Sequence, residues 1–360
     1  MHRLPLVLLS FLFVLTTACG DDGAGETTTT TPAPTTTTPT TTLVSTTTTM
    51  GEATTVTTYP AAYASPLNGL PAEDARFLDR RIVGVKIDNH PLARPQGGLD
   101  QADAVIETVV EALLTRFIAL YHDNDSDYVG PIRSLRPTDT ALMGPLDLAL
   151  AISGGQPWVQ NLAVERGVRL VGESEGFFRV GSRSAPHNLF TSTLAVRQTA
   201  DNRGYPDVTT QGLFQIGEWP IPDATATEIV LEWTDQTTVR WEWDEAAQAY
   251  TRWIGTNPHE WVRKDNTRGQ ITAQVLIVIS GTQYVAYPPG GNGTAVPAIE
   301  TQGYGPALIF AVGRVWEGQW HRDSLSSPYR LTELDGTPVV VPTGVPWISV
   351  FPNHRTISYQ

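Results

Sequence analysis

Carboxylates and imidazoles in the first half of the chain have the chemistry needed for proton transfer. Asp88, Glu107 and Glu111 are candidate acids or bases, and His187 is a fourth candidate because an imidazole titrates near neutral pH. His90, which follows Asp88 closely, is a second possible proton carrier. These residues support the hypothesis of a hydrolase that works with a carboxylate and a histidine.

Several arginines in the same half could instead recognise an anion, because guanidinium groups bind carboxylate and phosphate through paired hydrogen bonds. Amide and imidazole groups next to them would complete such a site. The candidate binding residues are Asp88, Asn89, His90, Arg94, Arg116, Arg133, Arg136, Arg183, His187 and Asn188. Binding of an anionic ligand is therefore the first hypothesis for the function, and hydrolysis is the alternative.

Two further interpretations of these residues stay open. Asp88, Arg116 and Arg133 could form a buried ion-pair network, with His187 and Asn188 capping a turn. Asp88 and the two histidines could also ligate a metal, but no short His-x-x-x-His spacing supports one, so no metal site is predicted. No cofactor can be named from the sequence.

The elements that would position these residues are strands followed by polar loops. Residues 82–88 form an apolar run that predicts a buried strand, and Asp88, Asn89 and His90 come at its carboxyl end. Open α/β sheets place ligand sites at that edge. Residues 148–152 predict a second buried strand, which leads into Gly154, Gly155 and a helix that starts near Trp158. Another helix is expected from Thr138.

The segment from residue 102 to 121 is ambiguous. Val105, Val109, Ala112 and Leu113 fit one face of a helix, whereas the density of β-branched residues fits a strand. A strand would place Glu107 and Glu111 on the same face.

From residue 206 onward the pattern is that of β-structure. Short apolar or alternating runs, separated by turn signals, predict strands at 228–233, 238–243, 251–254, 272–279, 307–311, 339–341 and 347–350. Trp241 and Trp243 alternate with Glu242, so both indoles should share one face. They form either the core of a sheet or, if exposed, a platform for sugar rings.

The N-terminus has the order of an export signal, with an arginine, an apolar stretch and small residues ahead of Cys19, the only cysteine. This arrangement resembles a bacterial lipobox, which predicts a signal peptide over residues 1–18 and lipidation of Cys19. The Thr- and Pro-rich residues that follow cannot form a core, so residues 19–60 are expected to be a disordered tether above the membrane.

The charge of the chain argues against nucleic acid as a partner. The formal net charge is -13 at pH 7 and the sequence pI is about 4.9, whereas nonspecific nucleic-acid binding needs a basic surface. The expected partners are the membrane, through the lipid anchor, and an anionic cell-wall polymer or its precursor.

Five motifs in order resemble the YerB-like lipoprotein family, which carries the DUF3048 domain: Ser65–Leu70, Ile87–Leu99, Thr115–Phe117, Gly130–Ser134 and Ala185–Leu189. Tyr250–Arg252, Gly318–Trp320 and Asp335–Ile348 are similar to the family's C-terminal module. The resemblance implies a fold and an envelope location but no reaction. The family commonly has Gly-Gly where this chain has Ala112 and Leu113, which favours a hairpin there, and often has Lys in place of Ser184.

Together these observations predict an α/β or α+β N-terminal domain with a mixed sheet at residues 61–205 and a β-rich C-terminal domain at residues 206–360. Asp88, His90, Arg116, Arg133 and His187 should converge on one polar cleft in the first domain. A scaffold that docks another envelope protein through its tryptophans is a third possible function, and it should expose an apolar patch.

Overall fold

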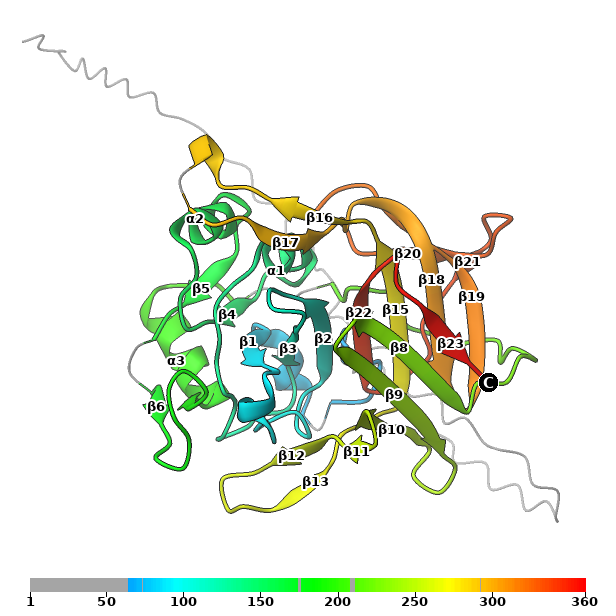
Figure 1. Cartoon of the computed structure of the whole chain (residues 1–360), viewed down its shortest axis with the longest axis horizontal. Coiled ribbons are helices and arrows are strands. Elements are labelled where there is room, and N and C mark those ends of the chain that lie inside the picture. The colour runs from blue at the N-terminus through cyan, green and yellow to red at the C-terminus, as the bar shows by residue number, and fades with distance from the viewer. Residues whose placement is uncertain (1–63, 73, 174–175, 208–210, 292) are drawn as a thin grey trace, which may run out of the picture. The chain divides into compact units, whose positions relative to one another are not determined.

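One mixed sheet of eleven strands runs through the computed structural model, in the order β21-β20-β19-β18-β15-β22-β2-β3-β1-β4-β5 (Figure 1). The structure describes residues 64–360 except 73, 174–175, 208–210 and 292. The predicted signal peptide, Cys19 and the tether therefore lie outside the described residues. Among the described residues, no helix has both the length and the apolar character that a membrane crossing requires.

The first half of the chain contains all three α-helices of the described residues. Its strands are β1 (Val83–Asp88), β2 (Ala104–Val109), β3 (Thr115–Tyr121), β4 (Ala149–Ala151), β5 (Arg169–Val171), β6 (Phe178–Arg179) and β7 (Leu189–Phe190). Its helices are α1 (Pro137–Leu142), α2 (Pro157–Glu165) and α3 (Thr193–Asn202), with 3-10 turns η2 (Ala75–Asp79), η3 (Pro91–Ala93) and η4 (Gly144–Leu146).

The second half is built from strands. They are β8 (Glu228–Thr234), β9 (Thr237–Asp244), β10 (Ala249–Ile254), β11 (Asn257–Pro258), β12 (Glu260–Val262), β13 (Arg268–Gln270), β14 (Thr272–Ala273), β15 (Val275–Gly281), β16 (Gln283–Ala286), β17 (Val296–Ile299), β18 (Gly303–Ala311), β19 (Arg314–Arg322), β20 (Arg330–Thr332), β21 (Pro338–Val339), β22 (Pro346–Pro352) and β23 (Ile357–Tyr359), with a 3-10 turn η5 (Pro289–Gly291). The predicted fold class, an α/β first half with a mixed sheet and a β-rich second half, is confirmed.

The two halves share the large sheet, because β22 of the second half pairs in parallel with β2 of the first. The predicted boundary near residue 205 thus falls in a connection between two parts of one hydrogen-bonded sheet. A smaller sheet, β11-β10-β9-β8-β23, packs on one face of it. The indoles of Trp233 and Trp241 make edge contacts with Phe351 and Trp347 there, at centroid distances of 4.9 and 5.3 Å.

The ambiguous segment is the hairpin of β2 and β3, in antiparallel register from Ala104 and Leu120 to Val109 and Thr115. Its turn is closed by the Leu114 N–H, which donates to the Glu111 carbonyl at 3.4 Å. Ala112 and Leu113 have φ values of 57° and 58°, the left-handed conformation that a type I′ turn requires. Glycine would therefore be conformationally suited to both positions.

Alternation along these strands sorts their side chains onto two faces. Arg116 lies opposite Asp88 in the β3–β1 register, and Lys86 shares their face because it lies two residues before Asp88. Phe117 lies opposite Ile87 and Glu107, so these three side chains belong to the other face. The end of β1 therefore presents charged side chains on the face that α1 and α2 cover with Leu142 and Val159, among others.

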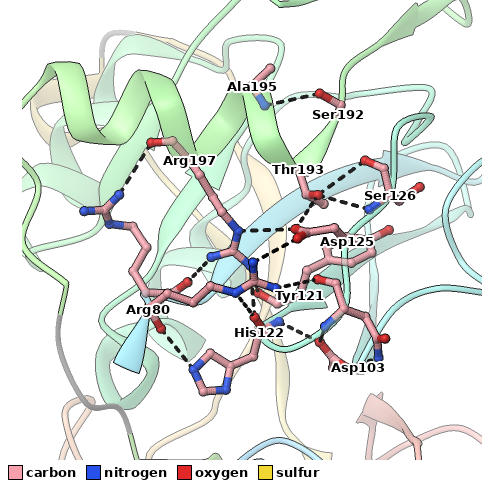
Figure 2. A network of polar contacts seen from close by, with 12 residues as sticks. Arg80, Asp103, Tyr121, His122, Asp125, Ser126, Ser192, Thr193, Ala195 and Arg197 are labelled. Atoms are coloured by element: carbon pink, nitrogen blue, oxygen red, sulfur yellow. Dashed lines mark hydrogen bonds and ion pairs between the residues drawn. The ribbon is translucent and has the colours of Figure 1, made fainter. Parts of the chain in front are cut away.

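The amino ends of β1 and β2 lie at the other end of these strands, away from Asp88. An arginine network covers this end (Figure 2). Arg197 of α3 donates to the carbonyls of Tyr121 and His122, and Arg80 pairs with Asp125 at 2.9 Å. Most of these donors are used on main-chain carbonyls, so this end is occupied by structural contacts.

Candidate functional site

Asp88 is the centre of the charged cluster at the carboxyl end of β1. The residue is 2% exposed, and its Oδ2 accepts from Nδ1 of His187 at 2.6 Å. Nε of Arg133 approaches the same oxygen at 3.1 Å. That contact is an ion pair without hydrogen-bond geometry, and the buried Nε of Arg133 has no hydrogen-bond partner among the described residues. Asp88 thus joins two side chains that lie far apart in the sequence.

The two histidines stack on each other, with ring centroids 4.5 Å apart and planes 20° apart. Nδ1 of His90 accepts from the Leu92 N–H at 3.1 Å. Because the Asp88 carboxylate accepts from Nδ1 of His187, the neutral His187 ring has its lone pair on Nε2. None of the described residues hydrogen-bonds to that nitrogen, so it is available for proton transfer.

Arg116 is a buried cation that forms no ion pair with the described residues. Its residue is 8% exposed, and Nη1 donates to the Ser134 carbonyl at 3.0 Å. No carboxylate of the described residues lies within 4 Å of its guanidinium. Burial and the nearby Arg136 and Arg133 lower the pKa of Arg116 to about 10. Its charge is therefore only partly compensated by the protein itself.

Further charges surround Arg116. Lys86 pairs with Asp139 at 2.6 Å, both side chains being fully buried, and burial lowers the pKa of Lys86 to about 8. Arg136 pairs with Glu111 at 2.7 Å. Although burial opposes it, the hydrogen bond from Arg136 holds the pKa of Glu111 below its usual value. With Asp88 and Arg133 this group has four cations and three carboxylates, so it is positive within a strongly acidic protein.

The loop after β4 fixes the segment that carries Arg133 and Arg136. The Ser153 N–H donates to the Arg133 carbonyl at 3.1 Å, and the Leu135 N–H donates to the Gly154 carbonyl at 3.0 Å. Gly154 has a φ of 92°, which suits glycine alone among common residues. The strand, glycine pair and helix recognised in the sequence therefore act here as support for the arginines.

Five predicted residues meet at this place. Asp88, His90, Arg133 and His187 are in direct contact, and Arg116 is their neighbour across the β1–β3 pair. We call these five residues the Asp88 site. Arg133 and His187 have side chains 20% and 11% exposed, so the site is partly open to solvent.

Four other candidates mainly support the chain around the Asp88 site. Asn89 is fully buried and donates from Nδ2 to Thr115 at 2.7 Å. Arg183 donates to the carbonyls of Ala93 and Pro95, both at 2.6 Å. Asn188 accepts from the exposed Arg179 at 3.0 Å. Arg94 donates to Asn89 and also lines a separate cavity, described below.

Glu107 does not belong to the Asp88 site. It is fully buried on the other face of the sheet, where it accepts from Arg252 at 2.9 Å, Trp347 at 2.9 Å and Thr115 at 2.7 Å. This placement corrects the expectation that Glu107 could act as an acid or base with Asp88. The expectation that Glu107 and Glu111 share a face also fails, because β2 ends at Val109.

Sequence reasoning missed Lys86 and its partner Asp139 as members of the charged group. The signal was a lone lysine inside the apolar run 82–88, which is unusual for a buried strand. Within the described residues, no group of three or more His, Cys, Asp or Glu side chains could hold a metal ion.

Comparison with known proteins agrees with the motifs in the sequence. Residues 67–206 match the N-terminal domain, and residues 229–348 the C-terminal domain, of a family described as "Protein of unknown function (DUF3048)". "Putative lipoprotein YerB" of Bacillus subtilis (strain 168) is 28% identical over 300 residues, which cover 80% of this chain and 86% of that protein. The crystal structure of YerB from Bacillus subtilis matches with a TM-score of 0.69 and 25% identity, over 82% of this chain and 99% of that one. The chain belongs to the DUF3048 family.

Proposed function

We propose that this protein is a lipid-anchored receptor of the cell envelope that binds an anionic envelope component at the Asp88 site. The observation that carries this proposal is Arg116, a buried guanidinium with neighbouring arginines and no carboxylate within 4 Å in the described part of the chain. A bound phosphate or carboxylate would supply the missing negative charge through charge-assisted hydrogen bonds. Arg133 lies near Arg116, and its buried Nε makes no hydrogen bond to the described residues.

The anchor is part of the same proposal. The relative from Bacillus subtilis is a lipoprotein by its printed name, and the residues before Cys19 resemble a lipobox. Lipidation of Cys19 would hold the folded part outside the cytoplasm, at the end of the Thr- and Pro-rich tether. Replacing Cys19 by serine should move the protein from the membrane fraction to the soluble fraction, and a protein that stays in the membrane fraction would contradict the anchor.

A retention experiment tests the binding function. The purified full-length protein is incubated with cell-wall fragments that either retain or lack their anionic polymers. We expect retention only with the polymers, and we expect Arg133→Ala to weaken it about tenfold or more because a charged contact is lost. Arg179→Ala is the matched control, since Arg179 also pairs with a carboxylate but is exposed. Equal retention of wild type and Arg133→Ala would reject the proposal.

Hydrolysis of the same component is a second candidate, favoured by the Asp88–His187 hydrogen bond. A carboxylate that orients an imidazole with a free Nε2 is the arrangement of a general base. The retention experiment separates the two functions when released products are also measured. If products appear, His187→Gln should abolish them while retention persists; retention without products indicates a binding protein.

The scaffold hypothesis receives less support from the tryptophans. The indoles of Trp233, Trp241, Trp320 and Trp347 are all fully buried. Trp243 packs at the edge of Tyr250 with centroids 5.1 Å apart. These residues form the core between sheets, so neither a sugar platform at Trp241 nor docking through these side chains is proposed.

A further inference from the structure

A cavity of about 200 Å³ lies close to the Asp88 site, between the loop after β1 and the second half of the chain. Arg94 lines it from the first half. Asn257, Pro258, His259 and Glu260 line it from the second half. The cavity is therefore lined by a candidate binding residue that is not part of the Asp88 site.

Arg94 resembles Arg116 in forming no ion pair within the described part of the chain. Its Nε and Nη2 donate to the side chain and the carbonyl of Asn89, at 3.0 and 2.8 Å. No carboxylate of the described residues lies within 4 Å of it, and its Nη1 makes no hydrogen bond to them. Burial and the charge of Arg252 lower the pKa of Arg94 to about 10. An anion in the cavity would relieve this unbalanced charge.

A chain of buried hydrogen bonds holds Arg94 in place. Arg252 donates from Nε to Nδ1 of His259 at 3.0 Å, so the neutral imidazole donates from Nε2 to Gln96 at 2.9 Å. Gln96 in turn donates to Asn89 at 3.1 Å. Burial and Arg252 keep the pKa of His259 well below its usual range, which preserves this direction of donation. The guanidinium of Arg94 is therefore preorganised.

Arg94 and Arg116 lie on the two sides of the end of β1. Arg94 hydrogen-bonds to Asn89, whose side chain contacts Thr115 at the start of β3. Arg116 is the next residue of β3, so its side chain lies on the opposite face of the sheet from Thr115. Asp88 is near both guanidinium groups, since its charge acts to raise the pKa of each. A linear ligand that crosses the strand end could meet both cations.

Building on the proposed function, we propose that Arg94 and its cavity form a second anion subsite, and that the ligand is a linear chain with repeated phosphate groups. One phosphate would pair with Arg116 and Arg133, and another with Arg94. Asn89 takes the Nε and Nη2 edge of Arg94, one of the two edges at which a guanidinium can bind a carboxylate with paired hydrogen bonds. Both N–H groups of Nη1 and the second N–H of Nη2 remain without a partner among the described residues, and the tetrahedral oxygens of a phosphate can accept from these donors.

Linear polyphosphates of increasing length are suitable probes for the full-length protein. We expect long chains to bind at least about tenfold more tightly than orthophosphate, because the second contact is intramolecular. Arg94→Gln should abolish this gain and leave orthophosphate affinity unchanged. Arg268→Gln is the control for charge, because Arg268 is exposed and lies 4.0 Å from Glu260. It should keep most of the gain.

A second variant gives a gain of binding that misfolding cannot imitate. The exposed Glu260 lines the cavity and repels an anion there, so Glu260→Gln should tighten long-chain binding about threefold without changing orthophosphate binding. Persistence of the long-chain gain in Arg94→Gln, or an unchanged affinity in Glu260→Gln, would overturn the second subsite. Equally tight binding of poly-glutamate would overturn the phosphate assignment. Failure of all anions to bind the wild type would instead overturn the proposed function.

Discussion

Oε1 of Glu107 accepts from Nη2 of Arg252 at 2.9 Å, and both side chains are fully buried. This ion pair connects the first half of the chain to the second, beside the strand pair β2–β22 that joins them. The guanidinium lies over the rings of Phe117, Trp241 and Trp347, at 5.5, 5.3 and 4.7 Å from their centroids. The two family domains are thus held together by a desolvated charge pair as well as by the sheet.

Breaking this pair from one side should be costly. Glu107→Gln leaves the Arg252 charge buried and uncompensated, so the free energy of unfolding should fall by about 3–5 kcal/mol. The double variant Glu107→Gln with Arg252→Met should lose less than the sum of the single losses, as urea unfolding can measure. Glu242→Gln, in a pair with Arg240 whose side chains are 35% and 29% exposed, should cost less, about 1 kcal/mol or below, because solvent screens the pair. Additive losses in the double variant would show that the pair is not coupled.

Local elements were predictable because local patterns specify them. The apolar run 82–88 contains β1, and the runs predicted at 228–233, 238–243 and 251–254 lie within β8, β9 and β10. The shared sheet was not predictable from such patterns. Trp347 reaches Glu107 across 240 positions, and nothing in either strand indicates its partner.

The candidate site was predictable in part for the same reason. Asp88 was recognised from its place at a strand end. Its contact with His187 spans 99 positions, and His187 was singled out because it lies in one of the motifs that resemble the family. Glu107 was misassigned because a strand pattern shows which residues alternate but not which face is buried against Arg252. The deciding information is tertiary in each case.

Glycine in place of Ala112 or Leu113 should increase the stability of the fold. Both adopt left-handed φ values, which cost a side-chain-bearing residue roughly 1–2 kcal/mol. Even after the greater freedom of glycine in the unfolded chain, Ala112→Gly and Leu113→Gly should each raise the free energy of unfolding by about 0.5–1 kcal/mol. The turn should keep its shape, because Thr234 and Thr237 both donate to the Leu113 carbonyl. The control Ala247→Gly, at an ordinary φ, should give no gain; stabilisation there as well would refute the argument.

Asp103 should make stability depend on pH. Burial and the nearby Asp123 raise its pKa to about 7, whereas an unfolded aspartate titrates near ~3.9. Between these two pKa values Asp103 is protonated in the folded state and ionised in the unfolded state. The contribution of Asp103 to the free energy of unfolding is therefore complete at low pH and is lost as the pH rises toward 7. Burial lowers the pKa of His122, so His122 has the opposite effect. Its contribution to stability rises with pH until the pH reaches the pKa of the unfolded histidine. Both residues lie in the network of Figure 2.

Comparison with Asp103→Asn isolates the Asp103 contribution, because His122 is present in both proteins. The difference in free energy of unfolding, wild type minus variant, should fall by about 1–3 kcal/mol between pH 5 and pH 8. Urea unfolding at the two pH values measures it. Asp127→Asn, at a side chain that is 70% exposed, should show little change. A difference that stays constant for Asp103→Asn would mean that its carboxyl group is already ionised at pH 5.

Arg116 should show a trade-off between stability and binding that separates a functional residue from a structural one. A buried cation without a carboxylate in reach destabilises the folded state, so Arg116→Met should raise the free energy of unfolding by about 1 kcal/mol or more while retention on anionic polymers is lost. Arg252→Met is the contrasting variant, because Arg252 is also buried but is paired with Glu107, and its loss should lower stability. If Arg116→Met also lowers stability, Arg116 serves the fold, and the site would lose the residue on which the binding proposal depends.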